Sequence, residues 1–412
     1  MIVTTLNNGQ LVTSGYIRFE NGEVKLEFKD DRETEFYSEI GFGTRSFKPS
    51  DGLEYLRAVV AVFRFSTCIV LVKEKQDEEW MSMSTNTLNS TKKAAVYKAD
   101  LNRRFWEYKR IHYPDQDDIF DASHPQDKGP PVFTKFGASN NIIFNPSIPS
   151  SEKEKLLSLI SEHERHRWFR SMSSSQALAQ SVLGNLAIHE SLPCLADLKD
   201  DEGMDLFGRA RFSSDNFFME HKIDHLREPH RTSLDGFIDG DFQVAIECKF
   251  TEAEVGTCSR TRLKKNASNY ESDLCNATYS KQRMRKGRCS LTEIGVLYWR
   301  YVPQLFNWNN DCDLSPCPLD RNYQLVRNIL AVGVKPDGSV SVNNGLALLI
   351  YDERNPYFKE YGQGLTAFKE TKEALREPNM LRKCSWQRLV QHLREKEVLP
   401  WLTKELGLKY GL

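Results

Sequence analysis

The sequence lacks three features that would each have decided its class. It has no Cys-x-x-Cys pair, which weakens the case for a zinc ribbon or a four-cysteine cluster. Its most apolar window, residues 58–72, is shorter than the roughly 20 residues that cross a bilayer and contains Arg64, so we expect no membrane span. Its formal net charge is only −1, which excludes a general attraction to polyanions. Any nucleic-acid surface must therefore come from a local cluster of charge.

What the chain does have is enough apolar material for large cores. With 412 residues, 40% of them hydrophobic, it is long enough for two or three folded domains. The opening MIVTTLNNGQ has neither the basic start nor the apolar core of a secretion signal. Together with nine cysteines spread along the chain, this favours a cytoplasmic protein whose thiols stay reduced.

Changes in pattern along the chain predict three parts. In residues 1–113, LVTSGYIRF and EVKLEF alternate apolar with polar residues around the turn ENGE, which indicates a β-rich N-terminal domain. Residues 114–150 are dense in Asp, Pro and Gly and read as a linker or loop. Residues 151–412 mix helical and strand patterns, with helices expected from 151 and over 175–188 and strands over 216–223, 232–239, 243–250 and 347–352. This order predicts an α/β domain with a mixed central sheet.

The segment QVAIECKF, residues 243–250, carries the most informative polar pair. Successive side chains of a strand point to opposite faces, so Glu247 and Lys249 share one face while the apolar residues share the other. A half-buried surface strand would explain this pattern without any function, because exposed Glu and Lys are common.

Asp235 favours a functional interpretation of that pair. It lies twelve residues before Glu247, at the head of LDGFI, and the Asp-Gly turn of IDGDF folds the two strands into a hairpin. We therefore expect Asp235 to approach Glu247. Two converging carboxylates suit a hard cation such as Mg²⁺ or Mn²⁺, and a neighbouring Lys249 can orient the attacking water or stabilise charge on a phosphate.

These motifs resemble the PD-(D/E)xK superfamily of metal-dependent nucleases. Asp235 matches the first acid, and Glu247-Cys248-Lys249 matches the ExK element. The larger set SSQALAQSVLGNL, LDGFI, ECKFTE, YQLVRN, LLIYDERNP and KCSWQRLVQHL is similar to bacterial restriction-endonuclease-like proteins over roughly residues 150–412. The resemblance implies a restriction-endonuclease-like mixed central sheet flanked by helices, with Asp235 and Glu247 as metal ligands.

The resemblance also points to auxiliary residues. The helix preceding the hairpin often lends a polar group, for which the candidates are Gln176, Gln180 and Glu190. YQLVRN places Tyr323, Gln324 and Arg327 within one helical turn, like the Gln/Tyr/Arg element of some members. The resemblance accordingly implies that Gln324 is a catalytic residue.

Two competing motifs occur in the same region. Glu220-His221-Lys222 is a second ExK, but it lacks the apolar frame and a turn-linked Asp. Asp224-His225 resembles the Asp-His pair of HNH nucleases, with LCN at 274–276 as the later part, yet the Cys-x-x-Cys pairs of that class are missing. Both rank below the Asp235 hairpin.

A local basic cluster follows the ExK strand. Between residues 260 and 288, nine cationic residues face only Glu271 and Asp273. The nine are Arg260, Arg262, Lys264, Lys265, Lys281, Arg283, Arg285, Lys286 and Arg288. Beside a metal site they would hold phosphates by charge without reading bases, whereas alone they would read as a solvated helix face.

The cysteines leave a structural metal open. Five of the nine lie between residues 258 and 317, and a zinc or iron–sulfur site would draw on Cys258, Cys289 and Cys317. Separate buried thiols are the favoured alternative, since the only close pair is spaced Cys-x4-Cys.

We therefore expect a magnesium-dependent endonuclease or exonuclease that hydrolyses DNA in bacterial defence or DNA processing. A protein partner or a second copy of the chain is the expected binding partner besides DNA. The alternative is a catalytically silent or partner-activated nucleic-acid-binding protein with a nuclease-like fold. In a third interpretation, the N-terminal domain holds the main function, as a sensor of a partner or ligand that controls the nuclease domain.

Overall fold

The computed structural model describes residues 2–7, 10–20, 23–28, 71–72, 83–228, 233–258, 289–308 and 317–412. The chain forms two compact units, Met1–Lys92 and Lys93–Leu412, and each is described by itself. No helix in the described ranges is long and apolar enough to span a membrane.

Among its described residues, the first unit has four strands, β1 (Ile2–Asn7), β2 (Gln10–Glu20), β3 (Glu23–Phe28) and β4 (Leu71–Val72). They pair antiparallel in the order β3-β2-β1-β4. Because most residues between 29 and 82 lie outside those described, the β-rich N-terminal domain stays a prediction.

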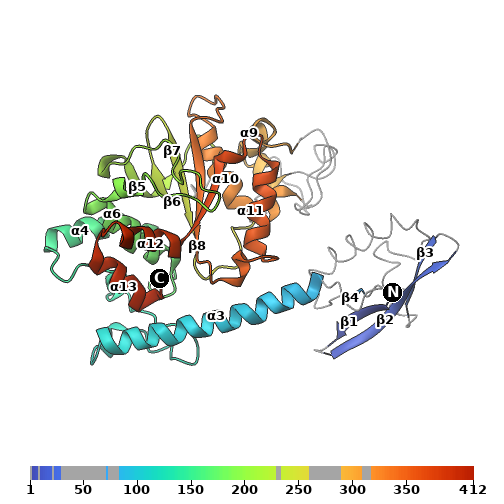
Figure 1. Cartoon of the computed structure of the whole chain (residues 1–412), viewed down its shortest axis with the longest axis horizontal. Helices are drawn as coiled ribbons and strands as arrows, with labels where there is room; N and C mark the ends of the chain where they lie inside the picture. Colours follow the sequence, from blue (N-terminus) through green and yellow to red (C-terminus); the bar gives the residue numbers. More distant parts are fainter. Residues whose placement is uncertain are drawn as a thin grey trace, which may run out of the picture. The chain divides into compact units, whose positions relative to one another are not determined.

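The second unit is built on a five-stranded sheet (Figure 1). Its strands are β5 (Phe217–Lys222), β6 (Ser233–Ile238), β7 (Gln243–Cys248), β8 (Gly345–Tyr351) and β9 (Leu381–Ser385), in that order across the sheet. β6 is antiparallel to both of its neighbours, β5 and β7, whereas β7, β8 and β9 are parallel. The predicted mixed central sheet flanked by helices is confirmed.

Helices cover both faces of this sheet (Figure 1). The α-helices are α3 (Met83–His112), α4 (Ser150–Ser158), α5 (Ser175–Ala179), α6 (Asn185–Ile188), α8 (Ser290–Glu293), α9 (Tyr298–Leu305), α10 (Tyr323–Gly333), α11 (Gln363–Ala374), α12 (Trp386–Glu395) and α13 (Pro400–Tyr410). A π-helical turn, Gln180–Gly184, joins α5 to α6. Short 3-10 helices lie at Asp117–Ile119, Ala138–Asn141, Glu162–Glu164, Leu192–Leu195, Ser214–Asn216, Pro318–Asp320, Pro356–Phe358 and Pro378–Met380.

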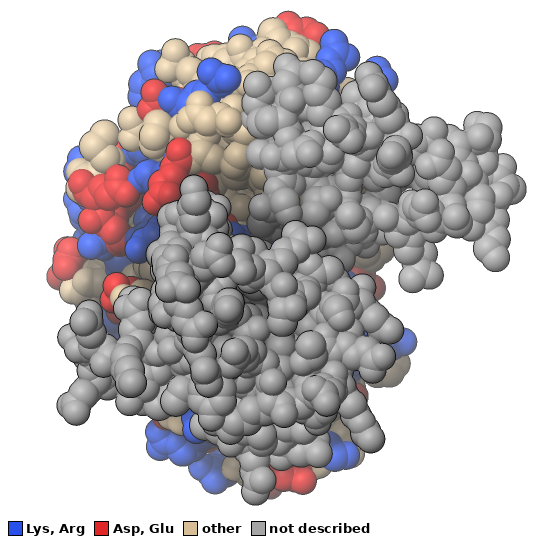
Figure 2. Space-filling view, turned by 90° about the vertical axis from the view of Figure 1, so that its right-hand side faces the viewer, with Lys and Arg blue, Asp and Glu red and all other residues tan. Residues whose placement is uncertain are grey.

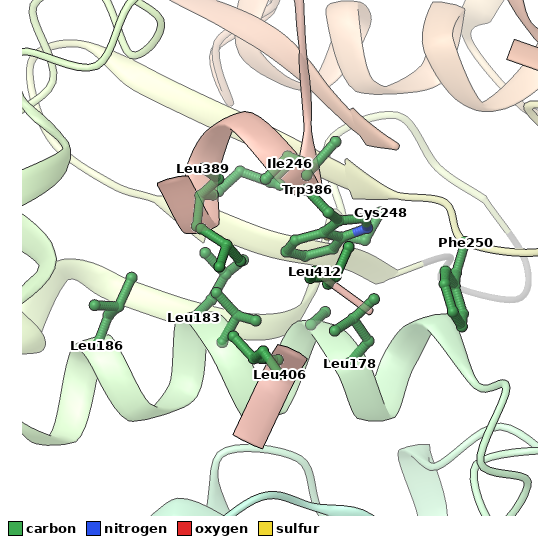
Figure 3. Close-up of a cluster of buried hydrophobic side chains, with 14 of the residues drawn as sticks. Leu178, Leu183, Leu186, Ile246, Cys248, Phe250, Trp386, Leu389, Leu406 and Leu412 are labelled. Carbon is green, nitrogen blue, oxygen red and sulfur yellow. The ribbon is translucent and has the colours of Figure 1, made fainter. Parts of the chain in front are cut away.

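The two faces of the sheet have separate cores. On one face, Ile246, Cys248 and Phe250 pack with apolar side chains of α5, the π-helical turn, α6, α12 and α13 (Figure 3). On the other face, Ala245 packs with residues of α9, α10 and α11. The alternation of QVAIECKF therefore sends Val244, Ile246, Cys248 and Phe250 to one core. It directs Ala245, Glu247 and Lys249 toward the face that carries α10.

Local capping explains where two of these helices begin. The side chain of Ser174 accepts a hydrogen bond from the amide of Ala177 at the start of α5. Ser385 does the same for the amide of Arg388 in α12, as its place before an apolar helical stripe predicts. Both helices are thereby fixed against the core face of β7.

The segment predicted as a linker packs with the second unit. Residues 114–150 contain short turns and 3-10 helices, yet Phe120, Phe133 and Ile143 are buried in the core of the second unit. Compactness divides the chain after Lys92, so these residues belong to the body that contains the sheet.

A buried lysine joins this segment to the last helix. Lys409 is 1% exposed, and its amine donates to the backbone oxygen and to Oδ1 of Asn141, at 2.6 and 2.9 Å. The rings of Tyr108 and Tyr410 lie 5.7 and 5.1 Å away. Burial lowers the pKa of Lys409 to about 7, although the negative charge of Glu405 opposes this change.

This burial predicts a pH-dependent stability. The pKa of Lys409 is about 7 in the folded chain but ordinary when unfolded, so between these values the unfolded state binds more protons and stability rises with pH. From pH 7 to pH 9, the wild type should gain about 2 kcal/mol in unfolding free energy relative to Lys409→Met. Urea denaturation followed by tryptophan fluorescence measures this difference. Lys404→Met, at an exposed position of the same helix, should change with pH as the wild type does.

Candidate active site

Three carboxylates form one row across β5, β6 and β7. Met219 pairs with Gly236 and His221 with Leu234, so Glu220 lies opposite Asp235. Gly236 pairs with Ile246, so one residue beyond this pair Asp235 lies opposite Glu247. We call Glu220, Asp235 and Glu247 the carboxylate row. Directly opposite residues of neighbouring strands share a face of the sheet, which brings the three acids together.

At Asp235 the hydrogen bond between the two strands is made by a side chain. Beyond the Gly236–Ile246 pair, Oδ2 of Asp235 accepts a hydrogen bond from the amide of Cys248 at 2.6 Å. The acid predicted at the head of the hairpin is therefore bound directly to the ExK strand.

Glu247 is buried and held by three donors. Its side chain accepts from Nη2 of Arg327 at 3.1 Å and from Nδ2 of Asn328 at 3.0 Å, and Nζ of Lys249 lies 2.9 Å from Oε1. Burial acts to raise the pKa of Glu247, but the positive charges of Lys249 and Arg327 lower it below its usual value. The glutamate is thus ionised at neutral pH in a site where it is only 2% exposed.

Lys249 is charged and directed by two neighbours. Its amine contacts Glu247 and donates to Oε1 of Gln324 at 2.8 Å. Burial acts to lower the pKa of Lys249, but the carboxylates of Glu247, Glu252 and Asp235 raise it above its ordinary value. The structure thus places the predicted Gln324 beside the lysine.

Gly256 allows Gln324 to reach that position. Gly256 has φ of +79°, and a Cβ built there would lie 2.4 Å from Oε1 and 2.5 Å from Cγ of Gln324. The amides of Gln324 and Tyr323 also donate to the backbone oxygens of Val255 and Gly256. The start of α10 therefore rests directly on the chain that leaves β7.

The backbone just after the ExK element is fixed by three distant parts of the unit. The indole of Trp386 donates to the oxygen of Lys249 at 3.1 Å. The hydroxyl of Tyr97 and the amide of Asn355 both donate to the oxygen of Phe250, at 3.1 and 2.9 Å. Helices α3 and α12 and the segment after β8 thus hold the end of the ExK strand.

The second ExK motif supplies Glu220, the third acid of the carboxylate row, which the sequence analysis did not place beside Asp235. Glu220 is 8% exposed, and its carboxylate accepts hydrogen bonds from Gln176, at 2.5 Å, and from Ser233. Its φ of +48° is unusual within a strand. The sequence did contain a signal for this position. If the expected strands 216–223 and 232–239 pair antiparallel from the turn outward, residue 220 lies opposite residue 235.

Burial is the largest influence on the pKa values of the other two acids of the row. Burial, followed by repulsion from Glu247 and Glu220, raises the pKa of Asp235 well above its usual value. Burial likewise raises the pKa of Glu220, with hydrogen bonds from Ser233 and Gln176 opposing it. Both acids would gain from a cation placed between them.

Of the three candidates on the preceding helix, one reaches the row. Gln176 donates to Glu220, whereas Gln180 donates to the backbone oxygen of Leu156 at 2.8 Å. Glu190 lies beyond the end of α6, with φ of +53°.

The remaining predicted residues fall in different places. Arg327 contacts Glu247, but the hydroxyl of Tyr323 donates to Glu228 at 3.0 Å. Asp224 and His225 follow β5, and the LCN that would complete their HNH-like motif lies outside the described residues.

The basic cluster of residues 260–288, with all nine of its Lys and Arg residues, also lies outside the described residues. Where the structure does describe the surface, Figure 2 shows basic and acidic residues interspersed on the coloured part of the face drawn there. Phosphate binding by the cluster therefore stays a prediction.

The cysteines proposed for zinc or iron–sulfur lie at one core. Cys317 is buried in the cluster formed with α9, α10 and α11, and Cys258 and Cys289 pack at its edge. Within the described ranges, no three His, Cys, Asp or Glu side chains are already grouped as around a bound metal ion.

Comparison with known families fits this geometry. Residues 113–411 match the model of a family described as Restriction Endonuclease associating with ARP, REase-ARP. The chain belongs to the REase-ARP family. Comparisons with curated proteins and with solved structures gave no match. Membership places the chain among restriction-endonuclease-like proteins, and the match covers the entire carboxylate row.

The residues present fit a divalent cation. Mg²⁺ is held in proteins by one or two carboxylates, with waters and substrate phosphates completing its shell. Asp235 and Glu247 supply two carboxylates, and burial together with the neighbouring carboxylates raises the pKa of Asp235, an effect that a bound cation would oppose. Glu247 is already paired with the positive charges of Lys249 and Arg327. A bound cation would therefore stabilise the charged form of Asp235 more than that of Glu247.

The buried pair of Glu247 and Arg327 predicts a strong coupling. Arg327→Met leaves Glu247 without one of its two cations, so we expect a loss of about 3 kcal/mol in unfolding free energy. Adding Glu247→Gln should restore at least half of that loss, because the uncompensated charge is removed. Urea denaturation of the two single variants and the double variant measures the coupling. Arg300→Met, at an exposed position of α9, serves as the control, and additive losses would contradict the pairing.

Proposed function

We propose that this protein is a divalent-metal-dependent nuclease of the PD-(D/E)xK type that hydrolyses phosphodiester bonds of DNA. The observation that carries the proposal is the placement of Asp235, Glu247 and Lys249 on one face of the sheet, with Lys249 bound to Gln324. Membership of the REase-ARP family supports the same conclusion.

Each residue has a role in this proposal. Asp235 and Glu247 hold Mg²⁺ or Mn²⁺, which when bound supplies a Lewis acid and lowers the pKa of water. Lys249 donates a hydrogen bond that orients the attacking water and stabilises charge on the phosphate oxygens. Gln324 accepts from Lys249 and keeps its amine directed into the site. The water gives up a proton to solvent as its oxygen bonds to phosphorus, one P–O ester bond breaks, and the leaving alkoxide takes up a proton from solvent.

Arg327 and Asn328 act through Glu247 rather than on the substrate. Their hydrogen bonds fix the carboxylate within a helix-covered site and keep it ionised. They are positioning residues, because they hold the carboxylate of Glu247 in place relative to that of Asp235.

The substrate side of the proposal rests on charge. The nine cationic residues between 260 and 288 follow the ExK strand directly and are proposed to hold the DNA backbone. A cytoplasmic role in bacterial defence or DNA processing is the setting that this chemistry favours.

A partner-activated nuclease is the second candidate, and two observations favour it. The description of the family names an association with ARP. In addition, Glu247 is 2% and Lys249 7% exposed, so a phosphate can reach them only after the site opens. We propose that a protein partner or a second copy assists this opening.

Cleavage of DNA tests the main proposal. Asp235→Asn should reduce metal-dependent cleavage by about 1,000-fold or more, and Lys249→Met by at least about 100-fold, because charge stabilisation at the phosphate is lost. The assay uses single- and double-stranded, linear and circular DNA with Mg²⁺, Mn²⁺ or EDTA. Asp241→Asn, an exposed acid in the β6–β7 turn, should cut like the wild type. Equal cutting by all variants would move the chemistry elsewhere, whereas binding without cutting by the wild type would favour the partner-activated candidate.

Glu220 is expected to strengthen cation binding from the end of the carboxylate row. Glu220→Gln removes one negative charge while keeping an acceptor for Ser233, so the affinity for Mn²⁺ should fall by about 5- to 10-fold. Titration calorimetry with Mn²⁺ in the absence of DNA measures this. Unchanged affinity would show that Glu220 serves only to hold Gln176.

A further inference from the structure

An exposed tripeptide stands between two anchors beside the carboxylate row. We call His166, Arg167 and Trp168 the HRW loop; all three are exposed, and Trp168 is 44% exposed.

Gln176 ties the start of this loop to the row. Its side chain accepts from the amide of His166 at 2.8 Å and donates to the oxygen of Glu164 at 3.1 Å. The side-chain amide of Gln176 also donates to Glu220, which lies opposite Asp235. A single buried side chain therefore joins the HRW loop to the proposed catalytic acids.

The end of the loop is anchored just as firmly. Phe169 is 1% exposed, and the amide of Asn141 donates to the backbone oxygens of Phe169 and Ser171 at 2.6 and 2.7 Å. The guanidinium of Arg165 lies 5.0 Å from the ring of Phe169 beneath the loop. These anchors present residues 166–168 outward in a fixed geometry.

The chemistry of the two outward side chains suits one class of ligand. The guanidinium of Arg167 lies 5.3 Å from the ring of Trp168, and within the described residues it has no carboxylate partner. A cation beside an exposed indole matches a phosphate next to an unpaired base, because aromatic rings stack on bases that lack a neighbour in a duplex.

We propose that the HRW loop binds a single-stranded segment of DNA at the cleavage site, with a base stacked on Trp168 and the adjoining phosphate paired with Arg167. The inference rests on the proposed function and refines its substrate: the preferred DNA contains unpaired nucleotides beside the bond that is cut.

Binding of labelled oligonucleotides tests this. Affinity of the full chain is measured in EDTA for a single strand, a blunt duplex and a duplex with a single-stranded overhang. Trp168→Ala should weaken binding of the single strand and the overhang by about 5- to 150-fold, whereas Trp168→Phe should keep most of the affinity. Binding of the blunt duplex should change by less than about threefold in both variants.

Further variants separate charge from stacking. Arg167→Ala should reduce the slope of log affinity against log salt by about 0.7 for the single strand, and Arg167→Lys should restore it. Met204→Ala is the matched control, because Met204 is 46% exposed and follows Asp201, which pairs with Lys383 on β9 at the opposite edge of the sheet. Thermal unfolding midpoints confirm that each variant is folded.

Three results would overturn the inference: unchanged binding in Trp168→Ala, an equal loss in Trp168→Phe, or an equal loss for blunt duplex. Its failure remains distinct from failure of the proposed function. Wild type that cuts DNA with metal while Trp168→Ala binds normally removes only the role of the loop, whereas wild type that neither binds nor cuts any DNA removes both.

Discussion

The register of three antiparallel strands determines this site. The pairings of β5 with β6 and of β6 with β7 align residues 220, 235 and 247 across the sheet. A shift of one residue in either pairing would turn an acid toward the apolar core. The core residues Ile246 and Cys248 flank Glu247 and make such a shift costly, so packing on one face of the sheet maintains the chemistry on the other.

Charge compensation is the second constraint. Burying acids together is unfavourable, and the second unit offsets part of the cost with Lys249 and Arg327 around Glu247. Asp235 instead relies on the amide of Cys248. The site is therefore asymmetric, with one fully compensated carboxylate and one that retains its need for positive charge.

Local patterns were enough to predict the hairpin, the strand alternation and the cap at Ser385, because each depends on residues close in sequence. Gln324 and Arg327 were named because YQLVRN resembles an auxiliary element of some PD-(D/E)xK nucleases, and they contact Lys249 and Glu247 in the structure. The role of Glu220 depends on a register between strands that no single motif contains, and its positive φ hides it further. The packing of residues 114–150 was missed because Asp, Pro and Gly mark turns whether or not those turns cover a core.

The residue at position 256 and the residue at position 324 depend on each other, because their side chains would occupy the same space. A side chain at position 256 would occupy the space of the amide that holds Lys249. Within the REase-ARP family, the two positions are therefore expected to covary: a chain that keeps glutamine at the start of this helix must keep glycine after the ExK strand. A chain that replaces the glutamine by a smaller residue removes this steric conflict, although the positive φ of position 256 still favours glycine there.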